Sequence, residues 1–88
     1  MSARKAPLGY QQITSLSAAT ALTVPSGASL AWVQAEVNNV RFRDDGTNPT
    51  ASVGFLLLAT NDFTYIGDLS AVKFIETTAS ATLNVLYY

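Results

Sequence analysis

The sequence contains neither cysteine nor histidine, and these two absences remove most of the common catalytic chemistry. Without cysteine the chain has no disulfide framework and no thiolate zinc site. Without histidine it lacks the commonest general base and the commonest ligand of transition metals. Its serine and threonine hydroxyls therefore have no imidazole to activate them, and the sequence has no glycine-rich phosphate loop. We expect no enzymatic activity and no cofactor.

Charge is also scarce, because only 12% of the 88 residues are charged and the formal net charge is −1. This balance gives no electrostatic reason to bind nucleic acid or an anionic membrane. The longest apolar run, Phe55–Ala59, is far shorter than the roughly 20 residues of a membrane-spanning helix. Residues 13–24 follow two cations, as in a signal peptide, but five Ser or Thr residues interrupt them. We therefore expect no nucleic-acid partner, no membrane partner and no export.

The six acidic residues form no recognisable catalytic or metal-binding pattern. Asp44 and Asp45 precede a glycine in a turn, but the turn lacks the alternating ligand spacing of an EF-hand. Backbone capping explains these two residues more simply. Glu36 and Glu76 are the one pair that suits a glycosidase, but the expected pairing of Glu36 with Arg41 favours a structural role. We expect no metal site.

Apolar residues, in contrast, are abundant, since 49% of the chain is hydrophobic. Soluble domains carry about 25% charged residues, twice the share found here. A chain of this size buries only about 60–70% of the surface that it exposes when unfolded. Some of the surplus is alanine, which tolerates exposure, but the remainder favours association with other subunits.

Short segments with β-type alternation succeed one another along the chain, separated by turn signals at intervals of about 8–12 residues. No segment shows the sustained apolar spacing of a helix. This pattern predicts an all-β fold, a small antiparallel β-sandwich or jelly-roll-like barrel of about seven or eight short strands. The expected strands lie around 13–16 and at 21–24, 30–37, 40–43, 53–58, 63–66, 71–76 and 81–86.

The strands form one domain over residues 10–88, and residues 1–9 lack periodicity. We expect this N-terminal segment to be a flexible arm. It orders when it lies across a neighbouring subunit, or alternatively it is a frayed terminus.

The segment 31–43 predicts a β-hairpin, because apolar and polar residues alternate on both sides of Asn38 and Asn39. Asparagine tolerates the left-handed backbone angles that a two-residue turn needs. The register then opposes the polar residues of the two strands in pairs: Glu36 with Arg41, and Gln34 with Arg43. A second hairpin is expected between 71–76 and 81–86. It opposes apolar residues: Phe74 with Leu83, and Val72 with Val85. Residues 53–58 are expected to be a buried strand, because their apolar residues run continuously.

Trp32 lies on the polar side of its expected strand, opposite Val33 and Ala35. An exposed tryptophan there would stack on a sugar or anchor a protein partner, whereas a sheet covered on both faces would make it a core residue. Arg41 and Arg43 suit either a protein interface or solvent-exposed pairs with residues of the neighbouring strand. The tyrosines suit either interfaces or sheet edges. The candidate protein-interface residues are Arg4, Lys5, Trp32, Gln34, Glu36, Arg41, Arg43, Tyr87 and Tyr88.

The stretch Val40–Thr50, VRFRDDGTNPT, resembles a group of small virion proteins of tailed bacteriophages and prophages. The likeness extends upstream through 13–28 and downstream through 67–75 and the final strand, and so covers most of the chain after Gly9. It contains no catalytic or contact motif, so it transfers no site residues.

The resemblance implies a capsid decoration or cement protein. Such a protein sits on the capsid exterior as a dimer or trimer and clamps neighbouring major capsid subunits, after assembly in the host cytoplasm. It acts through binding energy alone, with contacts of about 1,000–2,000 Å² repeated over a lattice. The alternatives are a tail, fibre or head-fibre module of the virion, and a carbohydrate-binding β-sandwich module that uses Trp32.

Overall fold

The computed structural model describes residues 6–88, and the regular elements in this range are all β-strands. They are β1 (Gly9–Ile13), β2 (Thr20–Ala21), β3 (Ala31–Glu36), β4 (Val40–Arg43), β5 (Phe55–Leu57), β6 (Asp62–Tyr65), β7 (Lys73–Glu76) and β8 (Thr82–Tyr87). The predicted all-β class and the approximate position of most strands are therefore confirmed. Residues 6–88 include no helix that could cross a lipid bilayer.

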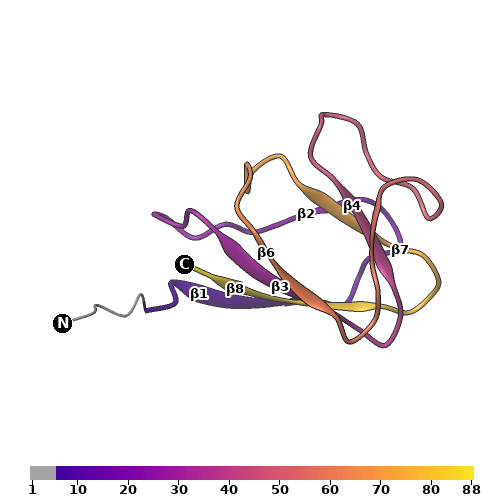
Figure 1. Ribbon diagram of the computed structural model, residues 1–88, viewed down its shortest axis with the longest axis horizontal. Coiled ribbons are helices and arrows are strands. Elements are labelled where there is room, and N and C mark those ends of the chain that lie inside the picture. The colour runs from indigo at the N-terminus through magenta and orange to yellow at the C-terminus, as the bar shows by residue number, and fades with distance from the viewer. Residues whose placement is uncertain (1–5) are drawn as a thin grey trace.

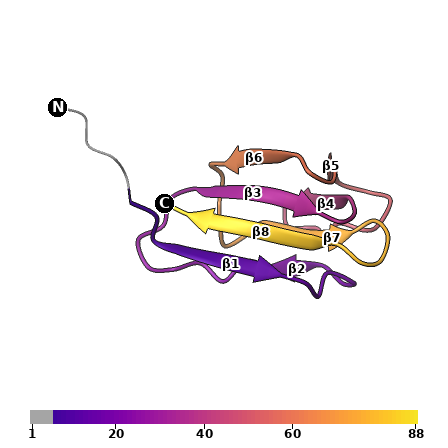
Figure 2. The ribbon, with the colours of Figure 1, turned by 90° about the horizontal axis from the view of Figure 1, so that it is seen from below.

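The strands form two four-stranded antiparallel sheets that face each other (Figures 1 and 2). One sheet has the order β1-β8-β3-β6 and the other the order β2-β7-β4-β5. Only the β4–β5 connection joins neighbours within a sheet, and every other connection crosses to the opposite sheet. This strand order is that of an eight-stranded jelly roll, one of the two architectures that the turn spacing predicts.

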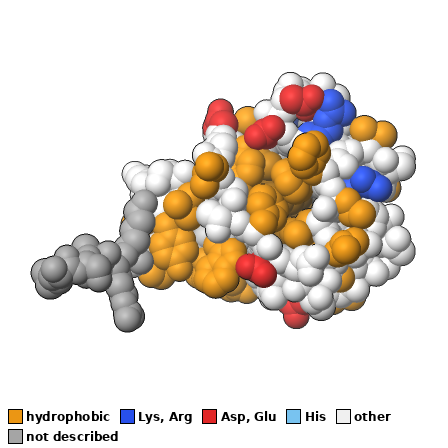
Figure 3. Space-filling view, in the orientation of Figure 1, with side chains coloured by type: hydrophobic (Ala, Val, Ile, Leu, Met, Phe, Trp, Pro, Cys, Tyr) orange, Lys and Arg blue, Asp and Glu red, His pale blue; other side chains and the backbone are white. Residues whose placement is uncertain are grey.

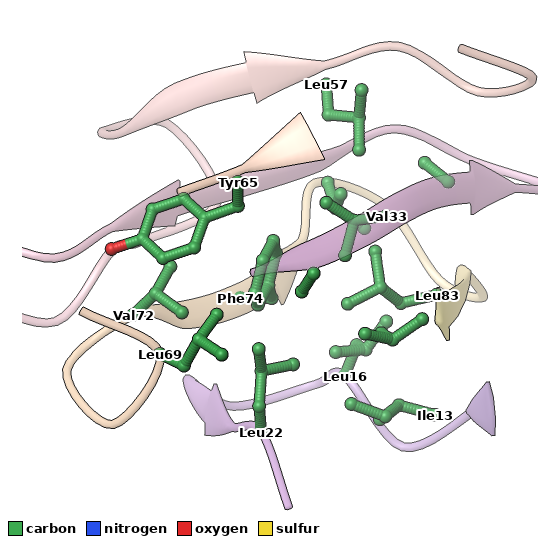
Figure 4. Close-up of a cluster of buried hydrophobic side chains, with 14 of the residues drawn as sticks. Ile13, Leu16, Leu22, Val33, Leu57, Tyr65, Leu69, Val72, Phe74 and Leu83 are labelled. Carbon is green, nitrogen blue, oxygen red and sulfur yellow. The ribbon is translucent and has the colours of Figure 1, made fainter. Parts of the chain in front are cut away.

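The core fills the space between the two sheets (Figure 4). Burial alternates strictly along β3 and along β8, so one side of each strand faces the core and the other faces outward. Completely enclosed side chains come from both sheets: Ala31, Val33, Ala35, Leu83 and Val85 from one, and Val40 and Phe74 from the other. Burial of a side chain as large as Phe74 or Leu83 stabilises the fold by about 1.5–3 kcal/mol.

Both predicted hairpins are wrong, although the strands in them are correct. β3 pairs with β6 and β8, whereas β4 pairs with β5 and β7 in the other sheet. β7 and β8 also belong to different sheets and do not pair with each other. Phe74 and Leu83 therefore approach the core from opposite sheets. Alternation places apolar residues on one side of each strand, and a connection between sheets satisfies that pattern as well as a hairpin does.

The two asparagines after β3 do not form the expected tight turn, because the left-handed residue is Val37, with φ of 75°. Instead they bind neighbouring loops. The Asn38 side-chain amide donates to the carbonyl oxygens of 79–80 at 3.1 and 2.9 Å. The Asn39 side-chain oxygen accepts from the backbone N–H of Ala59 at 2.8 Å. They thus tie three connections together at one end of the sandwich.

The segment predicted as a buried strand, 53–58, is largely exposed. Leu57 is buried, but Phe55 is 75% exposed and Leu56 is 47% exposed. A continuous apolar run indicates a strand covered on both faces only when neighbours flank it. β5 has a single neighbour, β4, and lies at the margin of its sheet.

Part of the expected N-terminal arm belongs to the sheet. The Leu8 N–H donates to the Tyr87 carbonyl at 2.7 Å, and Gly9 opens β1, where it pairs with Tyr87. The first strand therefore begins before the expected position near Ile13, and the domain begins before residue 10. Residues 1–5, with the candidates Arg4 and Lys5, lie outside the described residues.

Candidate binding surfaces

The outer side of the β1-β8-β3-β6 sheet carries a concentrated set of polar and aromatic side chains. Strand register aligns them in rows across the sheet. One row runs through Tyr10, Leu86, Trp32 and Thr64, and the next through Gln12, Asn84, Gln34 and Asp62. They surround an open depression of about 520 Å³. We call this surface the polar face and define it as Tyr10, Gln12, Trp32, Gln34, Glu36, Asp62, Asn84 and Leu86.

Asn84 is the centre of the polar face, because its side chain bonds to four others. Its oxygen accepts from the Tyr10 hydroxyl at 2.6 Å and from the Gln12 amide at 3.0 Å. Its nitrogen donates to the Gln34 oxygen at 3.2 Å and to a Glu36 carboxylate oxygen at 2.7 Å. These four bonds use the whole hydrogen-bonding capacity of an asparagine amide, so β1, β8 and β3 are linked through one residue.

Trp32 is 46% exposed, so the core alternative for this residue is wrong and the outward orientation is confirmed. Its indole Nε1–H donates to the Asp62 carboxylate on β6, the neighbouring strand. Tyr10, one strand beyond β8, is 59% exposed. The structure therefore brings Trp32, Gln34 and Glu36 together, as the sequence predicts, and adds four residues from strands that the sequence could not place beside them: Tyr10, Gln12, Asp62 and Asn84.

Tyr87 is not a surface residue, and its selection as an interface candidate is wrong. Its side chain is 1% exposed and its hydroxyl donates to the Gln11 side-chain oxygen. Burial raises the pKa of this phenol to about 12. The chain end next to it is partly buried, and the Tyr88 N–H donates to the Leu30 carbonyl at 3.0 Å. The inward alternation of β8 explains the difference, since Tyr87 follows Leu83 and Val85 on the core side.

The two arginines lie on β4, in the opposite sheet, so the expected pairs Glu36–Arg41 and Gln34–Arg43 do not form. Arg41 instead donates to the carbonyls of Ala51 at 3.2 Å and Gly54 at 2.8 Å. It thereby holds the loop that leads into β5.

Arg43 forms a two-pronged ion pair with Asp45, at 3.0 and 2.6 Å. This hydrogen bonding lowers the pKa of the Asp45 carboxyl. The pair lies at the end of β4 in contact with solvent, and screening by water makes its contribution to stability small.

A second surface lies where β5 and β6 end their respective sheets, on the same side of the sandwich (Figure 2). Hydrophobic side chains gather between the two sheets in this part of the molecule (Figure 3). We define the apolar edge as four residues in and around β5, which are between 47% and 75% exposed: Val53, Phe55, Leu56 and Leu58.

An aromatic cluster supports the apolar edge from within, and it contains all four phenylalanines of the chain. The Phe42 ring stacks on Phe63 of the facing sheet, with ring centroids 5.0 Å apart. It also contacts Phe74 at 5.6 Å and Phe55 at 5.7 Å. Phe74 is enclosed and Phe55 is open to solvent, so the cluster runs from the core to the surface.

Sequence reasoning missed the apolar edge, although its signal was present. The run Phe55–Ala59 is the longest apolar stretch of the chain, and its continuity predicts a buried strand. The pairing of β5 with β4 alone, which no single-strand pattern reveals, places this stretch at the surface.

The carboxylates of the described residues are dispersed, and no group of three or more of them could hold a metal ion. Within residues 6–88, the polar face offers aromatic rings for stacking and groups for hydrogen bonding, and the apolar edge offers apolar surface for burial. Comparison of the chain with protein-family models, with curated proteins and with solved structures found no match.

Proposed function

We propose that this protein is a structural component of a bacteriophage virion, specifically a capsid decoration protein that binds the major capsid protein and acts without catalysis. The observation that carries the proposal is the apolar edge. Phe55 is 75% exposed and three further apolar side chains around it are about half exposed. A chain with few charged residues that leaves such a surface open is suited to a covered position in an assembly.

Among residues 6–88, β5 is also an edge strand. β5 bonds to β4 on one side, and its other side is the margin of the sheet. Edge strands present N–H and C=O groups that another chain can pair with, and natural monomers usually blunt them with charge or proline. The three residues of β5, Phe-Leu-Leu, include neither. A second copy that pairs there would form the dimer or trimer expected of a decoration protein.

Two further points support the virion role. The stretch 40–50 carries the resemblance to phage virion proteins, and it leads directly from β4 toward the loop that positions β5. The jelly roll is also a recurrent fold of viral capsid proteins. Because one fold hosts many functions, these points add to the argument from the apolar edge and do not replace it.

The test is to locate the protein in particles of the phage or induced prophage that encodes it. We expect an image reconstruction to show it on the capsid exterior, in contact with the major capsid protein. We expect particles stripped of it to lose DNA at a lower temperature, and re-addition of the protein to restore them. Density confined to the tail or fibres would instead assign it to that part of the virion. Absence from the particle, or unchanged heat resistance of stripped capsids, would contradict the decoration role.

A further inference from the structure

The polar face presents two aromatic rings at a defined spacing. Tyr10 on β1 and Trp32 on β3 lie in one row, separated by Leu86 on β8. Neighbouring strands are about 4.8 Å apart, so the two residues stand roughly 10 Å apart across the sheet. Both side chains remain about half exposed. Rings at this distance can contact successive units of one extended ligand.

Hydrogen bonds to neighbours hold the polar ends of both rings. The indole N–H of Trp32 donates to Asp62, and the hydroxyl of Tyr10 donates to Asn84. The orientation of each ring is therefore set before a ligand arrives, and less side-chain entropy is lost on binding. The part of each side chain left for a ligand is chiefly ring carbon, which suits the apolar C–H side of a sugar.

Hydrogen-bonding groups lie in the next row, beside the rings. Asn84 engages one oxygen of Glu36 and the amide oxygen of Gln34. Within residues 6–88, the second Glu36 oxygen and the Gln34 amide nitrogen have no protein partner in this network. Asp62 likewise engages Trp32 through one oxygen. Carboxylate and amide groups of this kind accept from, and donate to, the hydroxyls of a polyol.

The charge of the polar face restricts the ligand further. The residues that line the depression include Glu36 and Asp62 but no lysine or arginine. A phosphate, a nucleic acid or an acidic sugar would meet like charge without a compensating cation. A neutral polyhydroxylated ligand is free of this penalty.

A protein partner fits this surface less well than a glycan does. Protein interfaces have a desolvated apolar centre and a polar rim, whereas here the most connected polar residue, Asn84, occupies the centre. The apolar edge, which includes β5 of the other sheet, has the apolar character that a protein contact needs.

We propose that the polar face binds a neutral glycan, with sugar rings stacked on Trp32 and Tyr10 and hydroxyls bound by Gln34, Glu36 and Asp62. This proposal does not rest on the decoration role, because the polar face and β5 belong to different sheets. Both surfaces can be occupied in the same molecule.

Trp32 is the only tryptophan of the chain, so its fluorescence reports directly on the proposed site. The experiment titrates the full chain with neutral oligosaccharides of glucose, galactose, mannose and N-acetylglucosamine, and with sialylated and sulfated oligosaccharides for comparison. We expect at least one neutral oligosaccharide to change the Trp32 emission at submillimolar to millimolar concentration and to give a matching heat in calorimetry. We expect the charged oligosaccharides to bind at least tenfold more weakly, or not at all.

Variants then locate the site. By calorimetry, we expect Trp32→Ala to weaken the binding at least about tenfold, since an aromatic contact of this kind supplies on the order of that factor. We expect Tyr10→Ala to weaken it by a smaller factor. Phe55→Ser, on the other sheet, is the matched control and should bind as the unaltered chain does. Trp32→Phe keeps a ring and should bind with intermediate affinity, and it serves where the alanine variant fails to fold.

Three results would overturn the proposal. The first is the absence of any emission change or heat with all neutral oligosaccharides at millimolar concentration. The second is equal glycan binding by the unaltered chain and by folded Trp32 and Tyr10 variants. The third is loss of capsid binding in Trp32→Ala while every glycan is inert, which would make the polar face a protein contact.

Discussion

The polar face and the apolar edge differ in the contacts that their exposed side chains make within the protein. On the polar face, side chains bond to one another, and Asn84 alone joins four partners. At the apolar edge, Phe55 packs on Phe42 on one side and is otherwise open to solvent. Strand neighbours explain the difference, because β8 and β3 are paired on both sides whereas β5 is paired on one.

If both proposals hold, one small core supports two kinds of recognition. The polar face is ordered before binding and suits a ligand that needs defined hydrogen bonds. The apolar edge gains from losing water, at roughly 25 cal/mol per Å² of apolar surface buried. We expect changes in the core to affect both surfaces and changes in either surface to affect that surface alone.

The largest effect is expected from Phe74→Ala. Phe74 is completely buried, and its ring contacts Phe42 at the base of the apolar edge. Its loss should reduce the free energy of unfolding by about 3–5 kcal/mol, a large part of the stability of a small domain. Urea denaturation measures the loss, and both surfaces should fail together. Phe55→Ala is the control, and a similar loss from that exposed ring would contradict the account.

Gly54→Ala should have a smaller effect, concentrated at the apolar edge. Gly54 has φ of 141°, and a Cβ there would lie 3.2 Å from the Phe42 carbonyl oxygen. We expect a cost of about 1–3 kcal/mol, with faster hydrogen exchange in β5 and unchanged exchange in β8. Gly46→Ala is the matched control, because Gly46 has φ of 89° but no atom within 4 Å of the added carbon. Equal destabilisation by both variants would show that the close contact at Gly54 is unimportant.

Asn84→Ala should affect the polar face alone. The variant removes four exposed hydrogen bonds, and we expect a stability loss of about 1–2 kcal/mol because water replaces most of them. Thermal unfolding measures the loss, with Thr82→Ala on the same side of β8 as the control. Association through the apolar edge should be unchanged. A change in oligomeric state with Asn84→Ala would mean that the two surfaces are coupled.

The smallest effect at neutral pH is expected from Tyr87→Phe, but this variant should change the response to alkali. Burial raises the pKa of Tyr87 to about 12, so the unfolded chain loses this proton at a lower pH than the folded chain does. The contribution of the protonated Tyr87 to the free energy of unfolding is complete below about pH 10. It is lost as the pH rises toward about 12.

Tyr65 adds to the same trend, since burial and the neighbouring Asp44 carboxylate raise its pKa well above the ordinary value. Denaturant midpoints between pH 8 and pH 11 should therefore fall for the unaltered chain, and fall less steeply for Tyr87→Phe. Identical slopes would exclude Tyr87 as a source of the alkaline sensitivity.

The sequence was informative about single strands and uninformative about their partners. Alternation correctly placed Val33 inward and Trp32 outward, because it depends only on the local backbone. The alternation could not show that β3 and β4 lie in different sheets. A hairpin within one sheet and a connection between two sheets would bury the same residues. The sequence therefore predicts only the part of the polar face that lies on β3. Asn84 belongs to the polar face because β8 pairs with β3, although the two strands lie far apart in the sequence.

Tyr87 and Phe55 show that burial could not be predicted from residue type and local pattern alone. The sequence predicts Tyr87 at an interface, but its side chain is enclosed, because the inward alternation of β8 includes Tyr87. The sequence predicts Phe55 in a buried strand, but its side chain is exposed, because β5 lies at the margin of its sheet. In both cases the position of the strand in the sheet decides burial, and residue type does not.

The most direct test of the central claim is the mass of the protein in solution, measured by analytical ultracentrifugation at micromolar concentration. The chain has a mass of 9.3 kDa. We expect the unaltered protein and Trp32→Ala to sediment as a dimer or trimer, and Phe55→Ser to sediment as a folded monomer. A monomeric unaltered protein, or an unchanged oligomer with Phe55→Ser, would contradict the assignment of the apolar edge as the association surface.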